Sequence, residues 1–222
     1  MESIDDVLNA LKRDILKQQG VINIKLAGIS LDIQAKDIIG NSLQEWLGSW
    51  FDINDINYRV LKNTQEFPDY IIDFDGVESY LEIKTWNYAK GPAFDLANFN
   101  SYIDSLEANP KKIDADYLIF GYLSNSKGFI VEDIFLKKIW QMAGASTVDP
   151  LKIQNKKGIV YNIRPMFFHT KPHSTFKNRL EFLSALTETK RKYSNQGTKI
   201  NDIDMWKEYI INEYYNITGN IL

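Results

Sequence analysis

The sequence predicts an α/β (α+β) fold in which a mixed β-sheet is flanked by helices. Strand-like runs alternate with segments of helical periodicity along most of the chain, as in sheets with helices on their faces. Residues 116–122 are nearly all apolar, which is typical of a strand covered on both faces in the middle of a sheet. With 222 residues, 44% of them hydrophobic, the chain can form a core as a single domain spanning residues 1–222.

The first two predicted elements are helices. Apolar residues at helical spacing predict an amphipathic helix over residues 3–18, with Ser3 as its cap and its end near Gly20. A second stripe of apolar residues predicts a helix from Lys36 to Trp50.

A β-hairpin is predicted next, preceded by a strand over residues 54–63. Two aromatic and β-branched runs flank an Asp-Gly turn signal. If the loop comprises residues 75–78, antiparallel pairing sets Asp69 opposite Lys84 and Ile71 opposite Glu82. The hairpin then completes an antiparallel meander.

This register has a chemical consequence, because paired residues share a sheet face and neighbouring residues along a strand alternate faces. Asp69, Glu82 and Lys84 are then expected within a few ångströms on one face. Tyr70, Leu81 and Ile83 are expected on the other face, and a slip of one residue in the register would scatter the cluster.

The remaining elements are predicted more coarsely, and they continue the alternation of strands and helices. In chain order they are a helix over 95–107, strands over 116–122 and 129–132, a helix over 134–142, a strand over 158–168, and helices over 175–193 and 202–216. The aromatic face of the last helix is expected to pack either into the core or against a second subunit.

Two carboxylates and an ammonium group at one point suit the hydrolysis of a phosphodiester. That reaction needs a nucleophilic water and neutralisation of charge on the phosphate, and a hard divalent cation supplies both. Asp69 and Glu82 provide the oxygen ligands that Mg2+ prefers, and the carbonyl of Ile83 is a candidate third ligand. Lys84 can orient the water, help to deprotonate it or hold the phosphate. The alternative is an exposed hairpin whose charges are only solvated.

The motif itself resembles that of a known family. Pro68-Asp69, a spacer of twelve residues and Glu82-Ile83-Lys84 are similar to the PD-(D/E)XK motif of type II restriction endonucleases. The resemblance covers Pro68–Lys84 and implies a restriction-endonuclease-like sheet with a catalytic core over about 36–135. It also implies metal-binding roles for Asp69 and Glu82, and a catalytic role for Lys84.

The same resemblance makes Glu45, on the helix before the hairpin, a candidate further catalytic acid. The alternative for Glu45 is an ordinary exposed glutamate. Enzymes of this kind cut both strands of a symmetric site, so a homodimer is expected, together with a cognate DNA methyltransferase in the same system.

Charge is distributed unevenly along the chain, although the net charge is only -3. Residues 1–150 carry a net charge of -9, residues 151–200 a net charge of +9, and residues 201–222 a net charge of -3. The middle segment predicts a surface that binds a polyanion such as double-stranded DNA. A solvated basic helix face is the alternative.

Candidate DNA contacts lie after the hairpin and in the basic segment. Backbone contacts are expected in the loop over 86–92 and at the following helix, and base readout from forked or bifunctional side chains in the loop over 164–179. The candidates are Asn87, Lys90, Asn98, Arg164, His169, Lys171, His173, Lys177, Asn178 and Arg179. The two histidines could otherwise be metal ligands, general bases or plain loop residues.

Several classes of protein are excluded. Zero cysteines exclude disulfides and thiolate zinc sites, and we find no nucleotide-binding or zinc-protease motif. No apolar run approaches the ~20 residues that span a bilayer, and the acidic N-terminus is unlike a signal peptide, so a cytoplasmic protein is expected. A structure-selective repair or recombination nuclease and a non-catalytic DNA-binding module remain as alternatives to the restriction enzyme.

Overall fold

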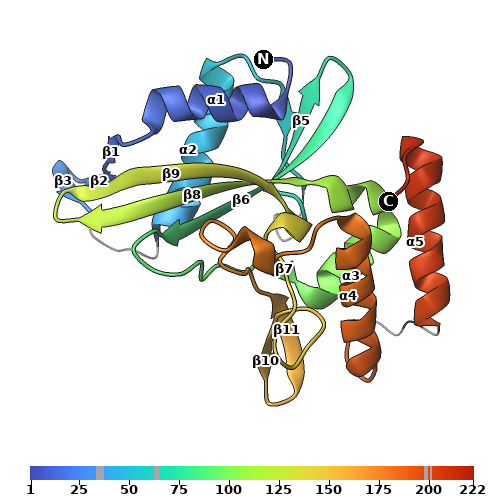
Figure 1. The fold of residues 1–222 in the computed structure, drawn as a ribbon. Helices are drawn as coiled ribbons and strands as arrows, with labels where there is room; N and C mark the ends of the chain where they lie inside the picture. The colour runs from blue at the N-terminus through green and yellow to red at the C-terminus, as the bar shows by residue number, and fades with distance from the viewer. Residues whose placement is uncertain (34–37, 63–65, 198–199, 201) are drawn as a thin grey trace. The chain divides into compact units, whose positions relative to one another are not determined.

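The computed structural model describes residues 1–33, 38–62, 66–197, 200 and 202–222, which form two compact units. Unit 1 comprises Met1–Pro92 and Asp116–Lys137, and unit 2 comprises Ala93–Ala115 and Lys138–Leu222. Unit 1 holds the large sheet and unit 2 holds a small sheet and three helices (Figure 1). None of the described helices is long and apolar enough to cross a membrane.

The sheet of unit 1 has six strands and confirms the predicted fold class. β6 and β8 are parallel, whereas β6 with β5, β5 with β4, and β1 with β9 are antiparallel, so the sheet is mixed. In spatial order the strands are β1 (Gln19–Gly20), β9 (Gly128–Lys138), β8 (Asp116–Asn125), β6 (Val77–Asn87), β5 (Tyr70–Phe74) and β4 (Tyr58–Arg59).

The apolar strand predicted over residues 116–122 is β8, and it lies between β9 and β6 as expected. Its residues from Asp116 to Tyr122 are all buried. Because β6 and β8 are parallel, the chain cannot join them by a tight turn and needs a long connection. That connection runs through the helix α3 (Phe99–Ala108) of unit 2.

The predicted hairpin is formed by β5 and β6, but its loop is shorter than expected. Asp75 and Gly76 both have positive φ, 52° and 87°, as a two-residue type I′ turn requires. Phe74 therefore pairs with Val77 and Tyr70 with Leu81. The predicted four-residue loop over 75–78 is wrong because Asp-Gly suits the tighter turn.

Two helices pack on one face of this sheet. α1 (Ile4–Ile15) begins after Ser3, whose Oγ accepts a hydrogen bond from the amide of Asp6, and α2 (Ile39–Ile53) follows. The predicted start of the second helix, Lys36, lies outside the described residues. Apolar side chains of both helices form one buried cluster with β5, β6, β8 and β9.

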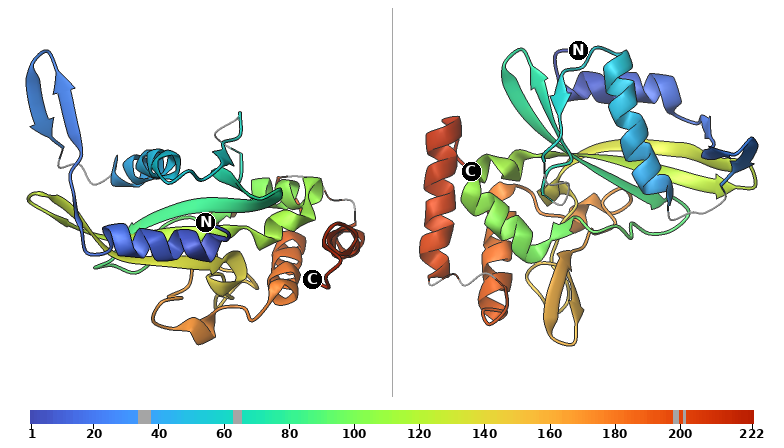
Figure 2. Two further views of the ribbon diagram at one scale, coloured as in Figure 1. Left: turned by 90° about the horizontal axis from the view of Figure 1, so that it is seen from above. Right: turned by 180° about the vertical axis from the view of Figure 1, so that it is seen from behind.

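Unit 1 also contains a hairpin that the sequence did not predict. Strands β2 (Asn23–Leu26) and β3 (Ile29–Asp32) pair only with each other, antiparallel. This hairpin stands away from the rest of unit 1 (Figure 2).

Unit 2 combines helices with a three-stranded antiparallel sheet in the order β10, β11, β7. Its strands are β7 (Ala97–Asn98), β10 (Ile153–Lys156) and β11 (Ile159–Ile163). Besides α3, its helices are α4 (Arg179–Lys192) and α5 (Ile203–Thr218), with short 3-10 helices η2 (Pro110–Asp114), η3 (Ile139–Gln141) and η4 (Pro172–Ser174).

Several predicted boundaries differ from the structure. The helix expected over 134–142 is wrong, because β9 continues to Lys138 beside β8 and only η3 follows. The strand expected over 54–63 is reduced to β4, and residue 63 lies outside the described residues. The helix expected from residue 175 begins at Arg179, where Asn178 caps it.

The other predictions hold with shorter or shifted bounds. The helix expected over 95–107 begins at Phe99 after its cap Asn98, and the strand expected over 158–168 ends at Ile163. Trp86 and Asn87, expected in a loop, are the last residues of β6. The final helix α5 starts after its cap Asp202.

Candidate active site

Asp69, Glu82 and Lys84 converge at the end of the β5–β6 hairpin, as the sequence predicts. The observed register differs from the predicted one by two residues, so it exchanges partners but keeps each side chain on its face. Continuing the pairing of Tyr70 with Leu81 by one step sets Asp69 beside Glu82. Glu82 and Lys84 then follow on the same face of β6, two residues apart.

Hydrogen bonds join the three residues directly. The Lys84 ammonium donates to Oε1 of Glu82 over 2.7 Å, and the backbone amide of Asp69 donates to Oε2 of Glu82 over 3.2 Å. The backbone amide of Ile83 donates to Oδ2 of Asp69 over 2.7 Å. These contacts hold the two carboxylates side by side.

The cluster is shielded from solvent, and this changes the acidity of Glu82. Only 9% of Glu82 is exposed. Burial raises the pKa of Glu82 to about 7; the charge of Lys84 opposes this rise and the charge of Asp69 adds to it. A buried carboxylate beside a second one is costly to ionise without a nearby cation.

Sequence reasoning missed Gln44, which contacts the cluster from α2. Its Nε2 donates to Oδ1 of Asp69 over 2.9 Å, and its backbone carbonyl accepts from the Tyr70 hydroxyl over 2.7 Å. Gln44 sits one position before the predicted Glu45, so the helix reaches the site as expected but through an amide. The sequence feature that could have identified Gln44 is its position on α2, next to the apolar stripe of that helix.

Glu45 is exposed on α2. Burial and Tyr58 raise the pKa of Tyr70 to about 12, and the charges of Asp69 and Glu45 contribute to this rise. The role of Glu45 as a further catalytic acid stays a prediction, as does the Ile83 carbonyl as a ligand.

The donor chemistry of the cluster fits a divalent cation. Two neighbouring carboxylates are the ligands that a hard cation accepts, with water and phosphate oxygens completing its coordination. Within the described part of the chain, no group of three or more His, Cys, Asp or Glu residues is placed to hold a metal ion. Asp69 and Glu82 provide two carboxylates, and the other coordination positions of such a cation are open to water and substrate oxygens.

The predicted DNA contacts fall in both units. Asn87 and Lys90 belong to unit 1, where the Asn87 side chain accepts from the amide of Ala89 over 3.1 Å. The carbonyl of Lys90 accepts from the Trp86 indole over 3.3 Å. The other eight predicted residues belong to unit 2.

Two arginines of unit 2 are engaged in ion pairs with acids far away in the sequence. Arg164 pairs with Asp95 and also donates to the carbonyl of Ala93 over 3.0 Å. Arg179 pairs with Asp114 and lies over the rings of Trp140 and Tyr214. Both guanidinium groups thus have partners within unit 2, and their contact with DNA stays a prediction.

Two predicted asparagines cap helices. Asn98 accepts from the amide of Ser101 at the start of α3, and Asn178 accepts from the amide of Glu181 at the start of α4. Of the other four candidates in unit 2, three are exposed, namely Lys171, His173 and Lys177. His169 is half-buried.

A mixed sheet that brings an Asp, a Glu and a Lys together beside a helix defines a nuclease of the PD-(D/E)XK class. The chain belongs to the NgoBV restriction endonuclease family, whose sequence profile matches residues 1–222.

Relatives within this class are closely similar. The chain is 35% identical over 210 residues to the type II restriction enzyme NlaIV of Neisseria lactamica, covering 91% of this chain and 85% of the relative. It is 33% identical over 146 residues to the type II restriction enzyme NgoBV of Neisseria gonorrhoeae, covering 64% and 82%. The solved structure of NlaIV restriction endonuclease matches with a TM-score of 0.89 at 30% identity, covering 100% of this chain and 92% of that one.

The protein is therefore a type II restriction enzyme, a site-specific endonuclease that hydrolyses phosphodiester bonds of DNA. Enzymes of this family work with a divalent metal cofactor. The two alternative functions, a repair nuclease and a non-catalytic binding module, are set aside by this membership.

Proposed function

We propose that Asp69, Glu82 and Lys84 are the catalytic residues of this enzyme, and that Asp69 and Glu82 hold Mg2+. The observation that carries the proposal is their convergence: Glu82 receives hydrogen bonds from the Lys84 ammonium and from the backbone amide of Asp69. Their all-oxygen donor set favours Mg2+ over softer metals. The Ile83 carbonyl and Glu45 are further candidates for this site.

Each residue has a role that follows from its contacts. Mg2+ bound here would activate water and neutralise charge on the phosphate. The Ile83 amide and the Gln44 side chain fix both oxygens of Asp69. The Lys84 ammonium lies beside Glu82, which suits it to orient the attacking water or to hold a phosphate oxygen.

We also propose that the basic segment of unit 2 contributes to DNA binding. The β10–β11 hairpin belongs to this segment, and residues 150–163 contain no acid. Lys156 pairs with Ile159, which leaves Lys157 and Gly158 as a two-residue turn with φ of 54° and 81°. A two-stranded ribbon fits the major groove of DNA, and the cationic tip favours contact with phosphates.

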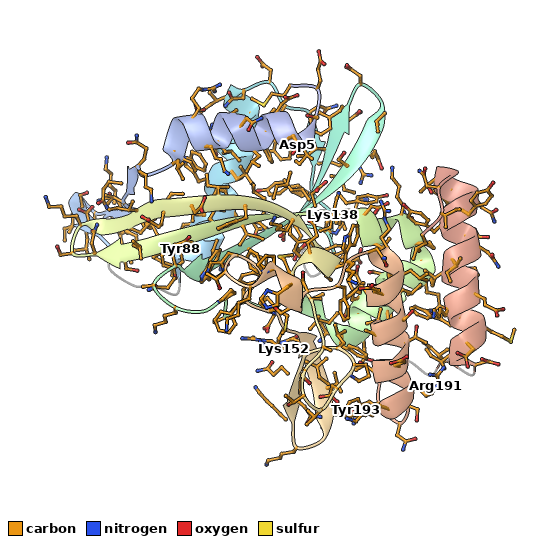
Figure 3. All side chains as sticks on the ribbon, viewed as in Figure 1. Asp5, Tyr88, Lys138, Lys152, Arg191 and Tyr193 are labelled. Atoms are coloured by element: carbon orange, nitrogen blue, oxygen red, sulfur yellow. The ribbon has the colours of Figure 1, made fainter. Side chains whose placement is uncertain are left out.

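This hairpin is anchored in unit 2 both at its base and beside its turn. Lys152, labelled in Figure 3, donates to the carbonyl of Pro165 over 2.8 Å. The Gln196 side chain accepts from the amide of Val160 over 2.8 Å and donates to the carbonyl of Gly158. The exposed candidates Lys171, His173 and Lys177 would add contacts from the neighbouring loop.

The assembly and cellular setting belong to the same proposal. A homodimer supplies one active site for each strand of a symmetric DNA site. A cognate methyltransferase would protect the host's own copies of that site. Because host and incoming DNA meet in the cytoplasm, the enzyme is expected to act there.

Plasmid cleavage with matched variants tests the catalytic proposal. Wild-type protein with Mg2+ should give discrete fragments with uniform ends, whereas Glu82→Ala and Lys84→Ala should bind the same DNA fragment but not cut it. Lys127→Ala, at an exposed position between β8 and β9, is the control and should keep cutting. Cleavage at wild-type rate by Glu82→Ala, or equal activity with and without chelator, would refute the assignment.

A further inference from the structure

The β2–β3 hairpin exposes an apolar face that nothing in unit 1 covers among the described residues. We call Asn23–Asp32 the finger. Its four aliphatic side chains are largely exposed: Ile24 by 51%, Leu26 by 74%, Ile29 by 71% and Leu31 by 60%. Isolated two-stranded hairpins are marginally stable in water, and exposed apolar patches of this kind mark interaction sites.

The register gathers these side chains on one face. Ile24 pairs with Leu31 and Leu26 pairs with Ile29, and paired residues share a face. The other face is polar and satisfied within the finger, because the Asn23 amide donates to Asp32 over 2.8 Å and accepts from the Ser30 hydroxyl over 3.0 Å. The finger is therefore amphipathic, with its polar face turned to water and its apolar face left for a partner.

Unit 1 also contains an apolar groove at the foot of the finger. We call this the foot groove; it has a volume of about 310 Å3 and is bordered by α1, α2, β1 and β9. Its apolar lining is Ile15, Val21, Ile22, Leu43, Trp46, Phe129 and Val131. The groove is open, and its size suits a few aliphatic side chains.

The finger and the foot groove are adjacent in the same chain, because Ile22 lines the groove and its carbonyl accepts from the amide of Ile33 at the finger's base. A second copy of this chain therefore offers both a groove for this finger and a finger for this groove. A two-fold contact repeats such a pair twice and closes on itself. A different protein would satisfy only one of the two surfaces for each copy.

We propose that the finger is the dimer arm of this enzyme and that its apolar face lies in the foot groove of a second copy. This inference rests on the proposed homodimer. Each strand of the finger rises about 3.3 Å per residue, so its apolar pairs reach well beyond the body that carries the groove. Exchange of two arms buries eight aliphatic side chains at the centre of the contact, where truncation of a contact costs most affinity.

The oligomeric state of a charge variant tests the arm. In L26D/I29D both substitutions lie at the exposed end of the finger, where they leave the core of unit 1 intact. Wild type should sediment as a dimer, and L26D/I29D should raise the dimer dissociation constant by on the order of a hundredfold. The control I53D/V60D places the same charges on exposed apolar residues of unit 1 outside the finger and should remain dimeric.

Cleavage measured in parallel separates this inference from the catalytic proposal. A dimeric L26D/I29D variant that cuts like wild type would overturn the arm and leave the active site untouched. A wild-type protein that is monomeric at the concentration where it cuts both strands would overturn both the dimer and the arm. Loss of cutting by Glu82→Ala is independent of either result.

A cysteine pair tests the placement in the groove. The chain has no cysteine, so Leu26→Cys and Ser42→Cys, the latter at the groove, introduce the only thiols. Oxidation of an equimolar mixture of the two single variants should give a disulfide-linked dimer of one copy of each. Linkage of Leu26→Cys protein only to itself would show finger against finger and would overturn the groove contact, as would the absence of any linked dimer.

Discussion

At Asp69 both carboxylate oxygens are already occupied by protein donors, and one of these donors is the Gln44 side chain. A group that orients a metal ligand without reacting typically contributes 10- to 100-fold to metal affinity or activity. We predict that Gln44→Met, which keeps length but removes the amide, lowers cleavage roughly tenfold and raises the Mg2+ concentration needed for half-maximal cleavage.

The measurement is a Mg2+ titration of cleavage at fixed DNA concentration. Ser49→Ala, at an exposed position of the same helix, should leave the titration unchanged. If Gln44→Met lost activity without any shift along the Mg2+ axis, its role would be structural instead of positioning.

Arg179 gives a second prediction at this scale. It pairs with Asp114, which also accepts from the Tyr214 hydroxyl, so this arginine ties α4 to η2 and α5. We predict that Arg179→Ala lowers the free energy of unfolding by about 1–3 kcal/mol, because it leaves a half-buried carboxylate without its cation. Lys177→Ala, an exposed neighbour, should leave stability unchanged in denaturant titrations. Equal stability of both variants would contradict this role.

The contrast between these sites shows what a sequence can reveal about residues. Asp69, Glu82 and Lys84 come together through one local hairpin, whose alternation of faces is readable along the chain. Arg164 and Arg179 find their acids 69 and 65 residues away. Such pairs depend on tertiary packing, so the sequence alone did not show that both arginines have acidic partners.

At the scale of elements, the β5–β6 turn sets the geometry of the active site. Gly76 has a φ of 87°, a conformation that costs other residues about 1–2 kcal/mol. We predict that Gly76→Ala lowers the free energy of unfolding by that amount, whereas Asp75→Asn is nearly neutral because Asn tolerates positive φ. Denaturant titrations of both variants measure this, and unchanged stability of Gly76→Ala would exclude the type I′ turn.

The convergence of the three residues was predicted correctly although the predicted length of the hairpin loop was wrong. The register moved by two residues, an even number, so Asp69, Glu82 and Lys84 stayed on the face that the sequence predicts. The helix predicted over 134–142 is wrong because β9 runs from Gly128 to Lys138 and so takes up the first half of that range as a strand. β9 lies beside β8 in the sheet. Pairing between these strands cannot be predicted from the residues of β9 alone.

The β10–β11 hairpin allows a prediction about DNA affinity. Removing two phosphate-binding lysines lowers the steepness of the salt dependence by about one unit each. We predict that K156A/K157A weakens binding to specific and non-specific DNA alike and reduces the salt slope by about 2. Lys127→Ala, at the tip of the β8–β9 hairpin of unit 1, is the control. An unchanged slope in K156A/K157A would remove this hairpin from the DNA contact.

At the scale of the whole molecule, one chain contributes a single cluster of Asp69, Glu82 and Lys84, and a duplex has two strands to cut. The proposed dimer, in which each finger lies in the foot groove of the other copy, would bring two such clusters to one DNA site. In that case each cluster acts on one strand, and loss of one cluster leaves a nick in place of a double-strand break.

Mixed dimers test this division of labour. When wild-type protein exchanges subunits with an excess of Glu82→Ala protein, most wild-type subunits should sit beside an inactive partner. We predict that supercoiled plasmid is then converted mainly to nicked circles, whereas wild type alone gives linear product. Agarose electrophoresis of the early products distinguishes these forms. Linear product in undiminished proportion at every mixing ratio would mean that each active chain cuts both strands by itself. Nicking that disappears when the Glu82→Ala subunits also carry L26D/I29D would link the shared cut to the finger.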